Sequence, residues 1–127
     1  MLETELMHRV MIAVSEMRFK TEDGRIKNCK IFRTNVGKRK MADGRWFDTG
    51  LPKGHPDLYG FRPDGRIFYI ETKLHPRKPT KEQKAFLLMA IDNGAIAGVA
   101  YTVEEALRIV EWSDGYGDVM KGAIMYG

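Results

Sequence analysis

The sequence predicts an α/β domain in which helices flank a mixed β-sheet. Apolar residues recur at helical spacing near the N-terminus, whereas residues 68–74 alternate as they do in a strand. Two capping boxes, Thr80–Gln83 and Thr102–Glu105, each begin a further helical pattern. The expected order is therefore helix, strands, hairpin, helix, strand and helix.

The first helix is predicted over residues 2 to 18. Its apolar stripe consists of Leu2, Leu6, Val10, Ala13, Val14 and Met17. Glu3 lies within this stripe, whereas Glu5 lies well off it. A carboxylate on a buried stripe is costly unless it is paired or binds a ligand. We therefore expect Glu3 to have such a partner.

The next segments are predicted to be short strands joined by turns. A turn at Glu22–Arg25 precedes a strand over Lys27–Asn35. A basic segment with several glycines follows over residues 37–54. Within it, Asp43 and Gly44 are expected to turn a short hairpin that presents Trp46.

The centre of the chain is predicted to be a hairpin that carries the candidate site. Pro63–Arg66 is a strong turn signal and would fold residues 68–74 back along the segment that follows Asp57. This pairing would bring Asp57 beside Glu71. Because alternate side chains of a strand share a face, Glu71 and Lys73 are expected to project together.

Two carboxylates and an ammonium group at one end of a sheet suit metal-assisted hydrolysis. Carboxylate oxygens are preferred ligands of Mg²⁺ and Mn²⁺. A bound metal makes hydroxide available near neutral pH and neutralises charge on a phosphate. Lys73 beside it would hold the attacking water and stabilise an oxyanion. The alternative is a surface ion-pair network, which contributes little free energy.

The second half of the chain is predicted to hold a helix, a strand and a second helix. The helix that begins at Thr80 should end near Asn93–Gly94. Its expected inward-facing residues are Ala85, Phe86, Met89 and Ala90. An apolar strand over residues 95–101 and a helix over residues 103–112 follow. Gln83 has a structural role as half of the first capping box.

The last residues, 114–127, form a glycine-rich tail. Its apolar residues are Val119, Met120, Ala123, Ile124, Met125 and Tyr126. This content is too apolar for a simple disordered end. We expect the tail to pack on its own domain or on a partner subunit.

Several segments around the candidate site share a recognisable pattern. They are Arg33–Gly37 (RTNVG), Gly54–Gly60 (GHPDLYG), Glu71–Lys73 (ETK), Pro79–Gln83 (PTKEQ) and the apolar strand and helix over residues 98–106. Together they resemble the virus-type replication-repair nuclease (VRR-NUC) domain of the PD-(D/E)XK nuclease superfamily, in its stand-alone phage or bacterial form. The resemblance covers residues 3–112. It implies a restriction-endonuclease-like αβββαβ core and a nuclease domain over residues 1–113.

The resemblance implies a metal site built from oxygen ligands. Asp57 and Glu71 would hold Mg²⁺ or Mn²⁺ together with the main-chain carbonyl of Thr72. An acid early in the first helix would complete the site. Glu3 fits the loose family pattern in that helix, and Glu5 is the alternative.

The same resemblance implies metal-dependent hydrolysis of DNA phosphodiester bonds. Lys73 would position the nucleophilic water, and Gln83 would orient Lys73 or the phosphate. The products would carry 5′-phosphate and 3′-hydroxyl ends. Stand-alone proteins of this kind resemble Holliday junction resolvases in acting as homodimers, so branched DNA in replication, recombination or repair is the expected substrate. The alternative is a non-catalytic nucleic-acid-binding module that retains the fold.

The charge distribution favours a phosphate backbone as partner. The chain carries a net charge of +4. Six basic residues against two acids lie between Arg33 and Lys53, and five against one lie between Lys73 and Lys84. Both blocks flank the carboxylates. The candidate DNA-binding residues are Arg33, Asn35, Lys38, Arg39, Lys40, Lys53, His55, Arg77 and Lys78.

Composition limits the remaining classes. A chain of 127 residues with 43% hydrophobic and 30% charged residues is typical of one globular domain. The sequence holds no apolar run long enough to span a bilayer, and the start MLETELMHRV lacks the apolar core of a signal peptide. Its single cysteine, Cys29, fits a reducing compartment. We therefore expect no membrane partner and a location in bacterial or phage-infected host cytoplasm.

Overall fold

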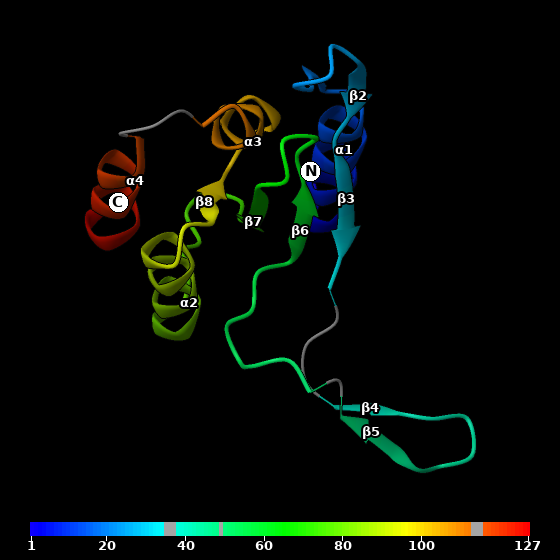
Figure 1. The fold of residues 1–127 in the computed structure, drawn as a ribbon. Helices are drawn as coiled ribbons and strands as arrows, with labels where there is room; N and C mark the ends of the chain where they lie inside the picture. The colour runs from blue at the N-terminus through cyan, green and yellow to red at the C-terminus, as the bar shows by residue number, and fades with distance from the viewer. Residues whose placement is uncertain (35–37, 49, 113–115) are drawn as a thin grey trace.

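The computed structural model describes residues 1–34, 38–48, 50–112 and 116–127 (Figure 1). In chain order the elements are α1 (Glu3–Ser15), β1 (Arg18–Lys20), β2 (Ile26–Asn28), β3 (Lys30–Arg33), β4 (Lys38–Lys40), β5 (Trp46–Asp48), β6 (Leu58–Phe61), β7 (Ile67–Thr72), α2 (Lys81–Asp92), β8 (Ile96–Ala100), α3 (Val103–Val110) and α4 (Tyr116–Tyr126). Within these ranges no helix is both long and apolar enough to cross a membrane.

A four-stranded mixed sheet forms the centre of the fold, in the order β3-β6-β7-β8. The first three strands are antiparallel neighbours, and β8 runs parallel to β7. Helices α1 and α3 pack against one face, and α2 packs against the other face at β7 and β8 (Figure 1). The mixed α/β class predicted from the sequence is confirmed.

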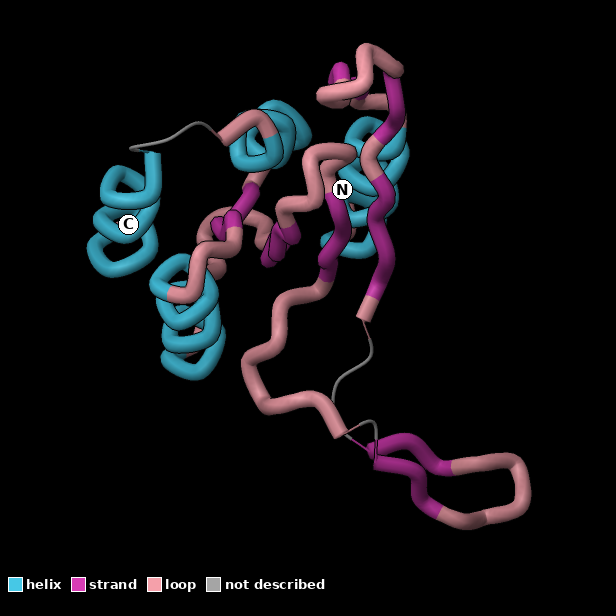
Figure 2. Tube along the Cα trace, in the orientation of Figure 1, coloured by secondary structure: helices cyan, strands magenta, loops and turns pink. Residues whose placement is uncertain are grey.

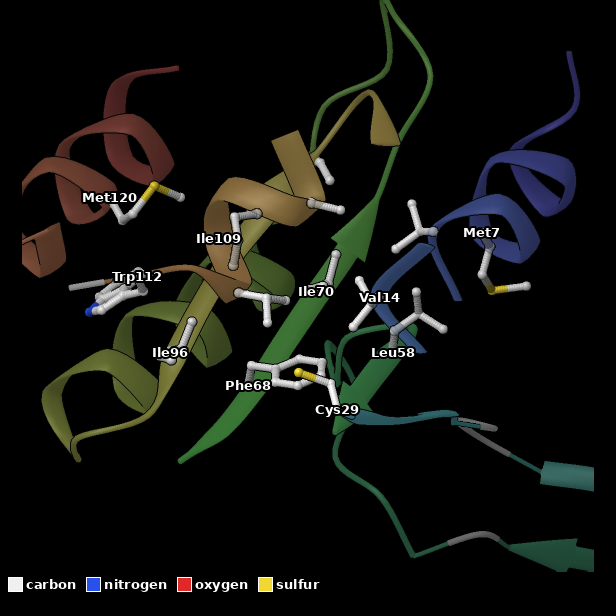
Figure 3. Close-up of a cluster of buried hydrophobic side chains, with 14 of the residues drawn as sticks. Met7, Val14, Cys29, Leu58, Phe68, Ile70, Ile96, Ile109, Trp112 and Met120 are labelled. Atoms are coloured by element: carbon white, nitrogen blue, oxygen red, sulfur yellow. The ribbon is translucent and has the colours of Figure 1, made fainter. Parts of the chain in front are cut away.

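The main core lies between the sheet and the pair of helices α1 and α3. Leu58, Phe68 and Ile70 are fully buried there, and they meet Val14 of α1 and Ile109 of α3 (Figure 3). The alternation predicted for residues 68–74 is thus confirmed on this face. Burying such side chains stabilises the fold by about 1.5–3 kcal/mol each.

The first helix faces the core largely as expected. Leu6, Val10 and Val14 of the predicted stripe are buried. Leu2 is an exception, because it is the N-cap residue of α1 and its side chain remains exposed.

The inward face of α2 differs from the prediction. Leu87 and Ala90 are its buried residues, whereas Ala85 and Met89 are exposed. The cause lies in the sequence, because residues 85–91 are all apolar. An unbroken apolar run carries no periodicity that could select one face.

A basic hairpin extends away from the sheet (Figures 1 and 2). We call residues 38–48, which comprise β4, β5 and their turn, the arm. Lys40 pairs with Trp46 across it, and the Trp46 side chain is exposed as expected. A loop over residues 50–57 returns to β6 (Figure 2).

The tail contains a helix, α4, that packs on its own chain. Met120 and Ile124 are buried, and α4 lies against α2 and β8 (Figure 1). Of the two places expected for the tail, its own domain is the one observed. Met125 and Tyr126 remain exposed.

Candidate active site

The β6–β7 hairpin places Asp57 directly beside Glu71. Leu58 pairs with Ile70, so the next positions in this antiparallel register are Asp57 and Glu71. The amide of Asp57 donates to Oε2 of Glu71 at 3.3 Å. In turn, Oδ2 of Asp57 accepts from the hydroxyl of Thr72 at 2.9 Å and from its amide at 3.3 Å. The two carboxylates therefore converge at one end of the sheet.

Lys73 completes a buried charged group at this end. Glu71 is 1% exposed and Lys73 is 4% exposed. The Lys73 ammonium Nζ lies 3.8 Å from Oε1 of Glu71, and the Lys73 amide donates to the carbonyl of Ala100 in β8. The alternative of a surface ion-pair network is wrong for this pair, because both side chains are shielded from water.

Burial and charge strongly perturb Glu71. Its pKa is raised from 4.5 to about 9, first by loss of water and then by the neighbouring carboxylate of Asp57. Lys73 acts in the opposite direction but does not offset these effects. Glu71 therefore holds its proton more strongly than an exposed glutamate does. Strongly perturbed carboxyl groups of this kind are typical of functional sites.

Gln83 connects the start of α2 to the carboxylates. Its Oε1 accepts from the amide of Thr80 at 2.8 Å, which completes the predicted capping box. Its Nε2 donates to Oε1 of Glu71 at 3.2 Å. The capping role and the position beside the site are thus combined in one amide. Because the Thr80 amide is a donor, the Gln83 side-chain oxygen must face Thr80, and the Gln83 NH₂ group therefore faces Glu71.

Gly54 allows α2 to begin this close to the site. Its φ is +95°, and a Cβ atom there would lie 2.5 Å from the carbonyl carbon and oxygen of Glu82 and 2.9 Å from the amide of Gln83. Only glycine permits both this backbone conformation and this contact.

Thr34 also holds Asp57 in place, and the sequence analysis did not identify it. Its amide donates to the Asp57 carbonyl at 2.9 Å. Its hydroxyl donates to the same carbonyl at 3.1 Å and to the carbonyl of Pro56 at 2.5 Å. The available signal was its position inside the RTNVG segment.

Glu3 is more buried than Glu5, in the direction predicted from the helical stripe. Its carboxylate pairs with Arg77 at 2.9 Å. The described residues contain no cluster of three or more acidic, histidine or cysteine side chains in a metal-binding arrangement. Glu3 is thus not brought together with Asp57 and Glu71 in this structure. Its carboxylate, which was expected to bind the metal, forms an ion pair with Arg77 instead.

The candidate DNA-binding residues that the structure describes lie at the end of β3, on the arm, in the loop over residues 50–57 and in the segment before α2. Arg33 ends β3 and Lys53 precedes Gly54, and both are exposed. Lys40 is exposed on the arm, where Lys38 and Arg39 lie on β4 with side chains outside the described part. Asn35 lies outside the described residues. The arm leaves the sheet at the end where Asp57 and Glu71 lie (Figure 1).

The remaining three candidates already have partners in the chain. Arg77 pairs with Glu3, and Lys78 donates to the carbonyl of Gly127 at 2.7 Å. The ring of His55 is half-buried and packs 4.8 Å from that of Phe86, measured between centroids.

The donor atoms suit a hard divalent cation. Asp57, Glu71 and the main chain at Thr72 offer oxygen alone, without sulfur or imidazole. A cation there would also relieve the repulsion that raises the pKa of Glu71. By donor chemistry and by charge, the site fits Mg²⁺ or Mn²⁺.

Comparisons of this chain with protein-family models, with curated proteins and with solved structures found no match.

Proposed function

We propose that this chain is a Mg²⁺- or Mn²⁺-dependent DNA endonuclease of the VRR-NUC type. The observation that carries the proposal is the buried Glu71, with Asp57 on one side and Lys73 on the other. A structural role alone gives no reason to bury Glu71 beside the half-buried carboxylate of Asp57 with only one ammonium group, because buried charges are costly unless balanced. A metal-dependent hydrolase requires this combination.

The order of the elements supports a PD-(D/E)XK core. Apart from the two-stranded sheets β1-β2 and β4-β5, a helix, three antiparallel strands, a helix and a parallel strand occur in the order α1, β3, β6, β7, α2 and β8. This is the αβββαβ order that the resemblance implies. Fold alone does not determine function, so the proposal depends on the site.

Each residue at the site has a proposed task. Asp57, Glu71 and the Thr72 carbonyl hold the cation, which when bound supplies a Lewis acid and an acidified water. The Thr72 hydroxyl fixes Asp57 through its bond to Oδ2. The Lys73 ammonium positions the attacking water and stabilises negative charge on the phosphate oxygens. Gln83 holds the orientation of Glu71.

Branched DNA bound by a homodimer is the proposed substrate and assembly. Two cuts in symmetry-related strands of a four-way junction require two sites related by a two-fold axis. With Met120 and Ile124 buried in their own chain, the tail offers Val119, Met125 and Tyr126 to such an interface. The exposed side of α1, with Ile12 60% exposed, is a second candidate.

The proposal is tested by cleavage of labelled four-way junctions and plain duplex with Mn²⁺ or with a chelator. Asp57→Ala and Glu71→Ala should abolish cleavage and leave the fold intact. Glu104→Ala, which removes an exposed acid at the start of α3, is the matched control and should cleave normally. Metal-dependent cleavage by either site variant at the wild-type rate would contradict the assignment, and a monomer mass in light scattering would contradict the dimer.

A further inference from the structure

Among the described residues, no helix packs on β3 and β6 on the face of the sheet that carries Glu71. Helix α2 packs on β7 and β8 on this face. Over β3 and β6, Phe32 and Phe61 are each 45% exposed. Large aromatic side chains left open on a sheet, rather than covered by a helix, indicate a contact surface.

Three aromatic rings form a continuous strip there. Phe32 and Tyr59 are paired across β3 and β6, and their ring centroids are 5.5 Å apart. Phe61 follows two positions after Tyr59, so it shares that face, with centroids 6.5 Å apart. We call Phe32, Tyr59 and Phe61 the aromatic strip.

The strip leads directly to the candidate active site. Tyr59 pairs with Tyr69 of β7, and Glu71 follows Tyr69 at the next position on the same face. Asp57 precedes Tyr59 by the same interval. The His55 ring also lies here, with its centroid 6.3 Å from that of Tyr59 and 5.7 Å from that of Tyr69. A molecule that lies on the strip is therefore next to His55 and, beyond it, to any phosphate held between Asp57 and Glu71.

A cation lies at the far end of the strip. Lys30 is exposed and is the direct partner of Phe61 across the two strands, which puts both on one face. The strip thus has carboxylates for a metal at one end and an ammonium group for a phosphate at the other. A nucleic-acid strand matches this order of chemistry, because it offers phosphates to the two ends and bases to the rings between them.

We propose that the aromatic strip stacks unpaired bases of the DNA strand that is cut, so that the substrate has single-stranded nucleotides beside the scissile bond. This inference rests on the proposed nuclease function. Aromatic side chains stack on any base, but in an intact duplex the base faces are already stacked on one another. The strip therefore favours flaps, gaps and opened branch points over plain duplex.

The test measures binding of a labelled thymidine oligonucleotide by fluorescence anisotropy, with a chelator present so that no cleavage takes place. Phe61→Ala and Phe32→Ala should each bind at least about fivefold more weakly than the wild type. Phe61→Leu should be equally weak, because it keeps the apolar volume but has no ring, whereas Phe61→Trp should restore binding. Ile26→Ala, at an exposed apolar position on β2, is the matched control and should bind normally.

An oligonucleotide with abasic sites isolates the stacking contact. It keeps the phosphates and removes the bases, so the wild type should bind it at least about fivefold more weakly than the normal oligonucleotide. Phe61→Ala should distinguish the two oligonucleotides less than the wild type does, because only Phe32 and Tyr59 remain to stack. Equal weakening of both oligonucleotides by Phe61→Ala, or rescue by Phe61→Leu, would overturn the inference. The inference would also be overturned if Phe61→Ala bound both oligonucleotides normally but no longer formed a dimer in light scattering. That result would assign the strip to contact with a second copy of the chain.

The outcomes also separate this inference from the proposed function. If the wild type cleaves DNA and Phe61→Ala retains both oligonucleotide binding and cleavage preference, the strip assignment fails and the nuclease stands. If Phe61→Ala loses base-dependent binding but no variant or wild-type protein cleaves DNA, the stacking strip stands and the nuclease fails. If both hold, Phe61→Ala should reduce cleavage of flaps more than cleavage of duplex.

Discussion

Gln83 donates from Nε2 to Oε1 of Glu71 while its own Oε1 caps the helix on which it lies. One amide thus links the stability of α2 to the geometry of the carboxylates. The two contributions can be separated, because Thr80 takes part in the cap but makes no bond to Glu71.

Gln83→Ala should reduce both stability and cleavage, whereas Thr80→Ala should reduce stability alone. Loss of either half of the capping box costs about 1 kcal/mol in the free energy of unfolding. Only Gln83→Ala also removes the donor that holds Glu71, so its cleavage rate should fall about tenfold. Urea unfolding and single-turnover cleavage measure the two effects. Equal cleavage by both variants would show that the Glu71 bond has no role in catalysis.

Without divalent metal, the protein should lose stability as pH rises from about 4.5 towards 9. The folded state keeps a proton on Glu71 that the unfolded state has already released. The contribution of Glu71 to the free energy of unfolding is therefore complete below its pKa in the unfolded chain. It is lost as pH rises through its pKa in the folded protein. The slope should approach about 1.4 kcal/mol per pH unit. Urea unfolding in chelator across this range measures it.

Glu71→Gln is the variant that tests the cause of this slope. It keeps the shape of the side chain and cannot ionise. Its free energy of unfolding should be nearly flat where that of the wild type falls. A slope of the same size in Glu71→Gln would assign the pH dependence to other groups.

Mn²⁺ should raise the unfolding temperature, and more so above about pH 8 than below about pH 5, because a carboxylate ligand must lose its proton to bind metal. At about a hundred times the dissociation constant, the gain in stability is about 2.7 kcal/mol. Glu71→Gln and Asp57→Ala should abolish most of this gain. Glu82→Gln, at an exposed position on α2, should retain it. A shift that is the same in all variants would indicate a metal site elsewhere.

The sequence determined the position of the hairpin because its signals are local. The turn at Pro63–Arg66 sets the register of β6 on β7, and this register brings Asp57 to Glu71. The Thr80 capping box was predictable for the same reason, since its two partners are three residues apart.

Contacts between distant segments could not be predicted in this way. The pairing of Glu3 with Arg77 joins residues 74 positions apart, and no local pattern encodes it. The tail was expected to pack, but its sequence did not show whether Met120 and Ile124 would face their own domain or a partner subunit. The aromatic strip depends on which half of the sheet α2 leaves uncovered, which only the assembled fold determines.

Gly54→Ala should lower both stability and cleavage, because the new Cβ atom would collide with the first turn of α2. It would lie 2.5 Å from the Glu82 carbonyl, so the helix start must move and take Gln83 away from Glu71. Gly24→Ala is the matched control, since its φ of +84° is similar but nothing beyond its chain neighbours lies within 4 Å of its Cβ position. Backbone strain alone should cost the control about 1–2 kcal/mol with full cleavage. Gly54→Ala should cost clearly more in urea unfolding and cleave more slowly under conditions where both variants are folded. If the two variants behave alike, backbone conformation rather than contact with α2 explains the glycine at position 54.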